Sequence, residues 1–166
     1  LSRQGHARSD GMNNPSRLQI TAGTARGRRL DSPTMYLRPM MGKVREAVFS
    51  TFTSFGVYDD GSLCRHLDIF AGSGSVGLES LSRGASSCTF VDLRSDCCAC
   101  IERNLTLTRL GETGTDNNNG TTSRAQVVCA DALTVLRDPA AVGIPQGTTF
   151  EFLTLCPPCE EVVDGE

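Results

Sequence analysis

The fold of this chain is decided by the stretch Leu67-Asp68-Ile69-Phe70-Ala71-Gly72-Ser73-Gly74-Ser75-Val76-Gly77, an apolar strand that runs into a glycine-rich turn before a helix. Gly72 and Gly74 leave no Cβ between the backbone and a ligand, so a nucleoside can lie across the strand end. The first N–H groups of the next helix have no partner within the helix and face the same place. The spacing also fits the dinucleotide fingerprint, which is a weak signal by itself.

Two acidic residues accompany this turn. Asp68 lies four residues before Gly72, where its carboxylate would reach a cation at the carboxyl end of the strand; it would repel a pyrophosphate and attract the amino group of S-adenosylmethionine. Asp92 ends a second strand-like run, 87–92, twenty residues after Gly72, a distance at which a carboxylate can bind ribose hydroxyls. The alternative for Asp92 is a solvated aspartate that binds nothing. The pattern as a whole favours S-adenosylmethionine over NAD.

Charge is distributed unevenly along the chain. Residues 1–50 hold nine Lys/Arg and three Asp/Glu, whereas residues 51–166 hold seven and sixteen, for a net charge of −3. A basic front and an acidic body fit a nucleic-acid-facing arm joined to a nucleoside-binding domain, and an arginine-rich segment without a partner is the alternative. No apolar run approaches the ~20 residues that span a bilayer, so we expect no membrane partner.

Eight cysteines raise the question of disulfides and metals. We expect no export signal, and several of the cysteines occupy apolar positions of expected strands and helices. We therefore expect free thiols in an intracellular reducing compartment, either the cytoplasm or an organelle such as a plastid or mitochondrion. The two Cys-x-x-Cys pairs, at 97/100 and 156/159, are separated by 55 residues, too far for a zinc ribbon, and we expect no metal.

Three regions follow from the pattern: a disordered basic tail at 1–17, an arm at 18–60 and a nucleoside-binding domain at 61–166 that we expect to be incomplete on its C-terminal side. In the arm, 17–23 and 27–30 predict two short strands around a basic turn. Val44, Val48, Phe49 and Phe52 then recur at helical spacing, which predicts a helix lying against the sheet.

The remainder alternates between strands and helices, which predicts a parallel α/β sheet with its ligand at the carboxyl ends of the strands. The polar segment 111–124 reads as a mobile surface insertion. After the first strand, the expected elements are a helix at 75–83, a strand at 87–92, a helix at about 95–110, a strand at 125–130, a helix at 132–137 and a strand at 149–155.

From about Leu18 onward the chain resembles the RsmD-like small-subunit ribosomal RNA methyltransferases, which methylate the exocyclic amino group of a guanine. The resemblance rests on the arm and the cofactor turn together. It implies a Rossmann-like class I methyltransferase sheet with an N-terminal basic β-hairpin and helix, S-adenosylmethionine as cofactor, and a monomer acting on ribosomal RNA or the small ribosomal subunit. The matching residues are Ile20, Gly23, Arg26-Gly27-Arg28-Arg29-Leu30, Leu37-Arg38-Pro39, Lys43-Val44-Arg45-Glu46, Phe49, Asp68 to Gly74 and Gly77-Leu78-Glu79.

The resemblance also assigns roles to residues. Asp68, Gly72 and Gly74 would hold the methionine end of the cofactor, Asp92 its ribose, and Asp131 the adenine amino group. The cofactor-binding set is Asp68, Phe70, Gly72, Ser73, Gly74, Asp92, Leu93, Asp131 and Ala132. The RNA-binding set is Arg26, Arg28, Arg29, Arg38, Lys43 and Arg45, and the catalytic set is Cys156, Pro157, Pro158 and Cys159.

The catalytic set departs from the family's pattern of Asp or Asn, two prolines and an aromatic residue. Cys156 offers a poor acceptor and Cys159 no π-face, so we expect weak or no methyl transfer. One alternative is a noncatalytic RNA-binding relative. Another is a cytosine carbon-five methyltransferase in which Cys159 attacks the base; against it, the chain continues Glu160-Glu161-Val162 instead of glutamine and an aromatic residue.

Overall fold

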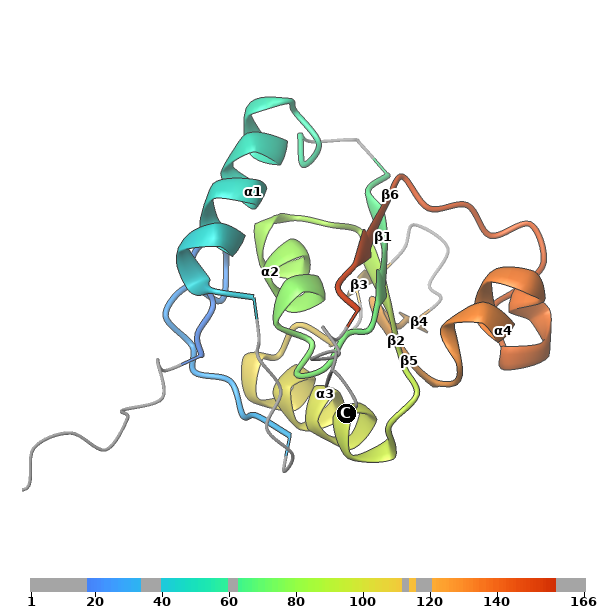
Figure 1. Ribbon diagram of the computed structural model, residues 1–166. Helices are drawn as coiled ribbons and strands as arrows, with labels where there is room; N and C mark the ends of the chain where they lie inside the picture. The colour runs from blue at the N-terminus through green and yellow to red at the C-terminus, as the bar shows by residue number, and fades with distance from the viewer. Residues whose placement is uncertain (1–17, 34–39, 60–62, 112–113, 116–120, 158–166) are drawn as a thin grey trace, which may run out of the picture.

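The computed structural model describes residues 18–33, 40–59, 63–111, 114–115 and 121–157. Within this part of the chain, four parallel strands form one sheet in the order β5-β2-β1-β6 (Figure 1). The sheet strands are β1 (Arg65–Ile69), β2 (Ser87–Asp92), β5 (Ala125–Cys129) and β6 (Phe152–Leu155). The other elements are α1 (Gly42–Ser54), α2 (Ser75–Arg83), α3 (Ser95–Thr108), α4 (Ala132–Arg137), the 3₁₀ helix η1 (Pro139–Val142) and the short pair β3 (Gly114–Thr115) and β4 (Thr121–Thr122).

The predicted parallel α/β alternation is confirmed, and the differences are shifted element ends and the short elements η1, β3 and β4, which were not predicted. α2 ends at Gly84, whose φ of 119° stops the helix as expected. α3 ends earlier than predicted because Arg109 adopts a left-handed φ of 58°. The segment 111–124, predicted as a mobile surface insertion, contains the antiparallel pair β3 and β4.

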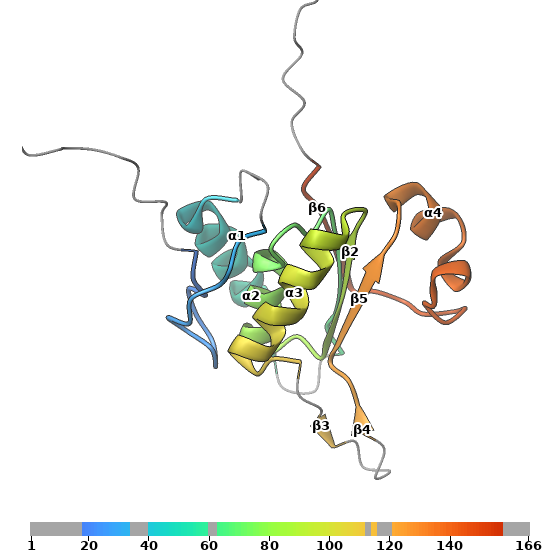
Figure 2. The ribbon, with the colours of Figure 1, turned by 90° about the horizontal axis from the view of Figure 1, so that it is seen from below.

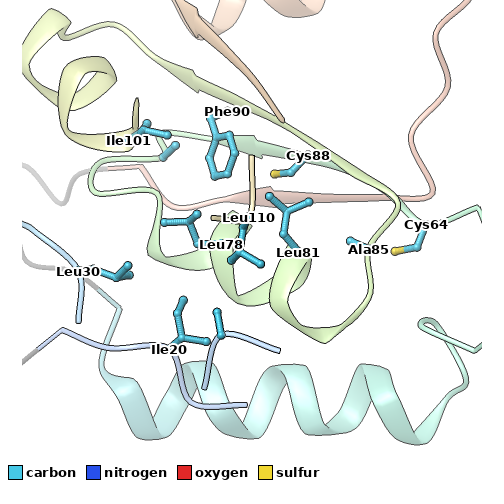
Figure 3. Packing of buried hydrophobic residues seen from close by; sticks show 12 residues of the cluster. Ile20, Leu30, Cys64, Leu78, Leu81, Ala85, Cys88, Phe90, Ile101 and Leu110 are labelled. Carbon is cyan, nitrogen blue, oxygen red and sulfur yellow. The ribbon is translucent and has the colours of Figure 1, made fainter. Parts of the chain in front are cut away.

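The sheet separates two cores. Along β1, Leu67 and Ile69 point to the side covered by α4 and η1, where Val135 and Ile144 are buried with them. Since side chains alternate along a strand, His66 and Asp68 face the opposite side. That side holds the larger core, in which residues of α2, α3 and the arm meet (Figure 3). None of the described helices is long and apolar enough to cross a membrane.

The arm pairs with itself and docks on α2. Gln19 and Arg29 form an antiparallel bridge, so the predicted hairpin is confirmed as a pairing, although it has no regular strands. Gly23 sits at the docking point with a φ of 80°, and a Cβ built on it would lie 1.8 Å from the carbonyl oxygen of Ser82. Only glycine permits this approach, which lets the N–H of Thr24 donate to the same carbonyl at 2.8 Å.

Helix α1 differs from its prediction in the face that it buries. Phe49 is buried, but Val44 is 48% exposed because Arg45 occupies the inner face. The helix packs mainly on α2, and it reaches the sheet through Phe52, whose ring centroid lies 5.3 Å from that of Phe152 in β6.

A buried carboxylate holds the arm against α2. Glu79 is inaccessible to solvent and accepts hydrogen bonds from the N–H and hydroxyl of Thr21, at 2.8 and 2.6 Å, and from the N–H of Ala22 at 3.0 Å. Burial alone would raise the pKa of Glu79, but the hydrogen bonds from Thr21 and the charge and hydrogen bond of Arg83 outweigh it. The pKa therefore lies below its ordinary value, and the group is ionised at neutral pH.

Two arginines supply positive charge beside Glu79. Arg83 of α2 lies 2.9 Å from Glu79, and Arg45 of α1 lies 3.5 Å from it. Arg45 also donates to the carbonyl of Gln19 in the arm. One carboxylate thus connects α1, α2 and the arm.

We predict that Glu79→Ala lowers the free energy of unfolding by about 3–5 kcal/mol, because it leaves the Arg45 guanidinium buried without its counter-charge. Urea denaturation measures this. The matched control is Arg94→Ala, which breaks the exposed Arg94–Asp96 pair and should change stability little. Equal losses in the two variants would show that the Glu79 cluster is not what holds the arm.

Candidate active site

The four parallel strands end at one edge of the sheet, and the predicted site residues follow these ends. Across the edge lie the loops 131–132 after β5, 92–93 after β2, 70–74 after β1 and 156–157 after β6. The structure thus brings together Phe70, Gly72, Ser73, Gly74, Asp92, Leu93, Asp131, Ala132, Cys156 and Pro157. Pro158 and Cys159 lie outside the described residues.

The glycine turn is fastened to the neighbouring loop by Asp92. The N–H of Gly72 donates to one oxygen of Asp92 at 2.8 Å, and the N–H of Arg94 donates to the other at 3.0 Å. Each carboxylate oxygen can accept more than one hydrogen bond, and Asp92 is only half-buried. The same carboxylate can therefore shape the turn and accept from a ligand hydroxyl.

The turn itself has an unusual backbone. Phe70 has a φ of 61°, in the left-handed region that non-glycine residues rarely adopt, and its side chain is 37% exposed. Beyond the turn, a Cβ on Gly77 would lie 2.3 Å from a ring carbon of Phe90 and 2.6 Å from the sulfur of Cys88. Gly77 therefore serves close packing of α2 on β2, which is the role of the third glycine in such fingerprints.

Asp68 lies beneath the turn. It is 1% exposed, and its two oxygens accept from the N–H of Gly77 at 2.9 Å and from the hydroxyl of Thr154 at 2.7 Å. Burial raises the pKa of Asp68 to about 6, although these two hydrogen bonds oppose the rise. The structure corrects the prediction that this carboxylate faces a ligand cation: it ties β1 to α2 and β6.

His66 extends this hydrogen-bonded chain, and sequence reasoning missed it. Its Nε2 lies 2.8 Å from the Thr154 hydroxyl, whose proton goes to Asp68, so His66 carries its proton on Nε2. Burial lowers the pKa of His66 to about 3, which keeps the ring neutral, and the ring stacks on Phe152 at 4.0 Å. The available signal was the spacing of two between His66 and Asp68, which puts both on one face of the strand.

The outer loops present different chemistry. Asp131 is exposed and caps α4 by accepting from the N–H of Thr134 at 3.1 Å, while Leu93 is 68% exposed beside it in the next loop. On the other side, the N–H of Cys156 donates to the carbonyl of Ile69 at 3.3 Å. Burial and the nearby charge of Asp68 raise the pKa of the Cys156 thiol, which therefore stays protonated at neutral pH.

The arm and the glycine turn both fall within the match to a known protein family. The model of the family described as "Conserved hypothetical protein 95" matches residues 18–140. The chain belongs to this family. Its relatives include "Ribosomal RNA small subunit methyltransferase D" (RsmD) of Escherichia coli, 36% identical over 112 residues that cover 66% of this chain and 53% of the relative. The predicted resemblance to RsmD-like proteins is confirmed.

Another relative, YlbH of Bacillus subtilis, is 34% identical over 145 residues, 87% of this chain and 68% of YlbH. Among solved structures, Escherichia coli yhhF matches with a TM-score of 0.56 at 30% identity, over 72% of this chain and 56% of that one. A hypothetical protein of Thermus thermophilus matches with a TM-score of 0.59 at 30% identity, over 74% of this chain and 61% of that one. The chain spans about half the length of its Escherichia coli RsmD relative.

In this RsmD-family chain, the predicted RNA-binding residues do not form one surface at the site. Arg26 and Arg29 are exposed on the arm's turn, and Arg28 donates to the carbonyls of Leu107 and Thr108. These carbonyls end α3, which begins at the site edge and is roughly 20 Å long at 1.5 Å per residue. The basic turn therefore lies at the far end of α3 (Figure 2).

The other three predicted RNA-binding residues lie in different environments or outside the described residues. Lys43 is exposed on the first turn of α1. Arg45 is 1% exposed and engaged with Glu79, so the prediction that it binds phosphate is wrong. Its position on the inner face of α1 is the physical reason. Arg38 lies outside the described residues.

We predict a pH effect from Asp68. Its pKa is raised from 3.8 to about 6 in the folded protein, so the stability that it contributes below pH 4 is lost as pH rises through about 6. Asp68→Asn cannot ionise, and the variant should gain about 3 kcal/mol relative to wild type between pH 4 and 7, at 1.36 kcal/mol per pKa unit.

Urea denaturation across this pH range measures the difference. Asp96→Asn is the control, since Asp96 lies in the exposed pair with Arg94 and its replacement should change the pH dependence of stability little. Parallel pH curves for wild type and Asp68→Asn would contradict the burial of an ionisable Asp68.

Proposed function

We propose that this chain is an S-adenosylmethionine-dependent RNA methyltransferase that acts on the exocyclic amino group of a guanine in small-subunit ribosomal RNA. The observation that carries the proposal is the glycine turn that Asp92 holds by a hydrogen bond, at the same sheet edge as the loops 131–132 and 156–157. The basic arm is docked on the same domain. Relatives from Escherichia coli and Haemophilus influenzae are named ribosomal RNA small subunit methyltransferase D, and the latter is 40% identical over 91 residues.

The residues at the edge suit a nucleoside. Asp92 and Asp131 supply acceptors for ribose hydroxyls and an adenine amino group, and exposed Leu93 supplies an apolar surface for the base. Gly72 gives the ligand a backbone without a side chain at the strand end. A Cβ on Gly74 would instead lie 3.1 Å from a side-chain carbon of Ile101, so Gly74 serves the packing of the turn on α3. The bound cofactor would supply an electrophilic methyl group. Asp68 acts indirectly, by holding α2 and β6 in place beneath the turn.

The target base would meet the loop after β6. Its amino group must point its lone pair toward the methyl, which requires hydrogen-bond acceptors on the protein side. A protonated Cys156 thiol is a weak acceptor, so the backbone carbonyls of Cys156 and Pro157 are the acceptors we assign. We therefore expect slow methyl transfer. RNA binding depends on the exposed Arg26, Arg29 and Lys43. The described cysteines are free thiols, which suits a reducing compartment such as the cytoplasm.

We predict that Asp92→Asn weakens S-adenosylhomocysteine binding by about tenfold, because a charge-assisted hydrogen bond to a hydroxyl contributes about 1.5 kcal/mol or more. Isothermal titration calorimetry with the wild-type chain and the variant measures the effect. Asp138→Asn, which alters the carboxylate that caps η1, is the matched control and should bind normally. If wild type binds NAD and ignores S-adenosylhomocysteine, the proposed function is wrong.

We predict that RNA affinity depends on salt through the arm. The double variant Arg26→Ala/Arg29→Ala should lower the slope of log K against log salt by roughly 1.4, at about 0.7 per phosphate contact on single strands. Fluorescence anisotropy with a guanine-containing RNA oligonucleotide measures the slope. Arg137→Ala, on α4 across the sheet, should leave it unchanged; a full wild-type slope in the double variant would show the arm's turn to be only a solvated surface.

A further inference from the structure

One buried side chain touches both the arm and the glycine turn. Asn104, in the middle of α3, is inaccessible to solvent. Its Nδ2 donates to the carbonyl of Ser73 in the turn at 2.9 Å and to the carbonyl of Asp31 in the arm at 3.0 Å. Its Oδ1 accepts from the N–H of Asp31 at 2.7 Å. Its partners on the arm and the turn are therefore backbone groups.

This arrangement requires an amide. A carboxylate would keep the acceptor for the Asp31 N–H but would lack both donors, and it would face two carbonyl oxygens. Alanine would leave the carbonyl of Ser73 and both polar groups of Asp31 without these hydrogen bonds, and the buried carbonyl of Ser73 is costly to leave unpaired. The turn and the arm consequently cannot move independently of each other without losing hydrogen bonds at Asn104.

The arm connects this contact to its basic turn. The N–H of Leu30 donates to the carbonyl of Leu18 across the hairpin at 2.9 Å, and Arg28 is held against the end of α3. Asp31 is the next residue in the chain after Leu30. A displacement of the hairpin therefore acts on residue 31 and, through the Asn104 amide, on the Ser73 carbonyl.

We infer that Asn104 is a positioning residue that couples RNA binding on the arm to cofactor binding at the glycine turn. The inference rests on the proposed function, which supplies the two ligands. Coupling between two sites is reciprocal, so RNA must change cofactor affinity by the same factor by which cofactor changes RNA affinity. A purely structural Asn104 would affect stability but not this factor.

The test uses the full chain and measures the dissociation constant of S-adenosylhomocysteine by calorimetry, with and without a saturating guanine-containing RNA oligonucleotide. We expect at least a fivefold difference in wild type, about the lower end of typical coupling. In Asn104→Ala and Asn104→Asp the difference should shrink to less than about twofold. Thr108→Val is the control on α3, since its buried hydroxyl bonds, among the residues that the structure describes, only to carbonyls of its own helix, and it should keep the wild-type factor.

A second pair of variants tests the contact from the arm side, should the Asn104 variants fail to fold. Asp31→Pro removes the N–H that Asn104 accepts, and it should also reduce the factor to less than about twofold. Asp31→Ala keeps that N–H and removes only the exposed ion pair with Arg103 at 3.6 Å, so it should keep the factor.

The outcomes separate this inference from the proposed function. If wild type binds both ligands with no change in either affinity, or if Asn104→Ala and Asp31→Pro keep the full factor, the inference is wrong and the function stands. If wild type binds neither ligand, the proposed function is wrong and the coupling falls with it.

Discussion

The buried charge of Glu79 is the constraint on which the rest of the structure depends. A carboxylate without solvent access must receive hydrogen bonds and counter-charge from the protein, and Glu79 receives them from the arm, α1 and its own helix. The arm in turn has little apolar surface of its own, and Ile20 and Leu30 are buried against α2 and α3 (Figure 3). The segment that carries the basic turn and the segment that carries the glycine turn therefore share one core.

Local patterns were enough to predict the sheet. Helix α2 is bounded by glycines, β2 is an apolar run that ends in an acid, and α4 follows a capping aspartate, so each element carries its own boundary signal. The end of α3 was predicted less well, because Arg109 adopts a left-handed conformation that its residue type does not predict. Such deviations shift an end without changing the order of the elements.

The site was predictable where spacing alone places a residue, and not where a distant partner decides its role. Asp92 reaches the turn because strand and helix lengths fix its position. Asp68 is engaged inside the protein by Thr154, 86 residues away, which donates to it. Arg45 is buried because Glu79 lies beneath it, and a motif of basic residues gives no sign of this. Asn104 carries no motif, and its partners lie 31 and 73 residues away.

Gly23 has a consequence for how this protein can evolve. Every substitution there adds a Cβ that collides with the backbone of α2. No substitution at this position is therefore neutral for the docking of the arm. Arg26 and Arg29, a few residues on, are exposed, so packing does not restrict their side chains. Selection can therefore change what the arm binds while the contact that docks the arm on α2 stays the same.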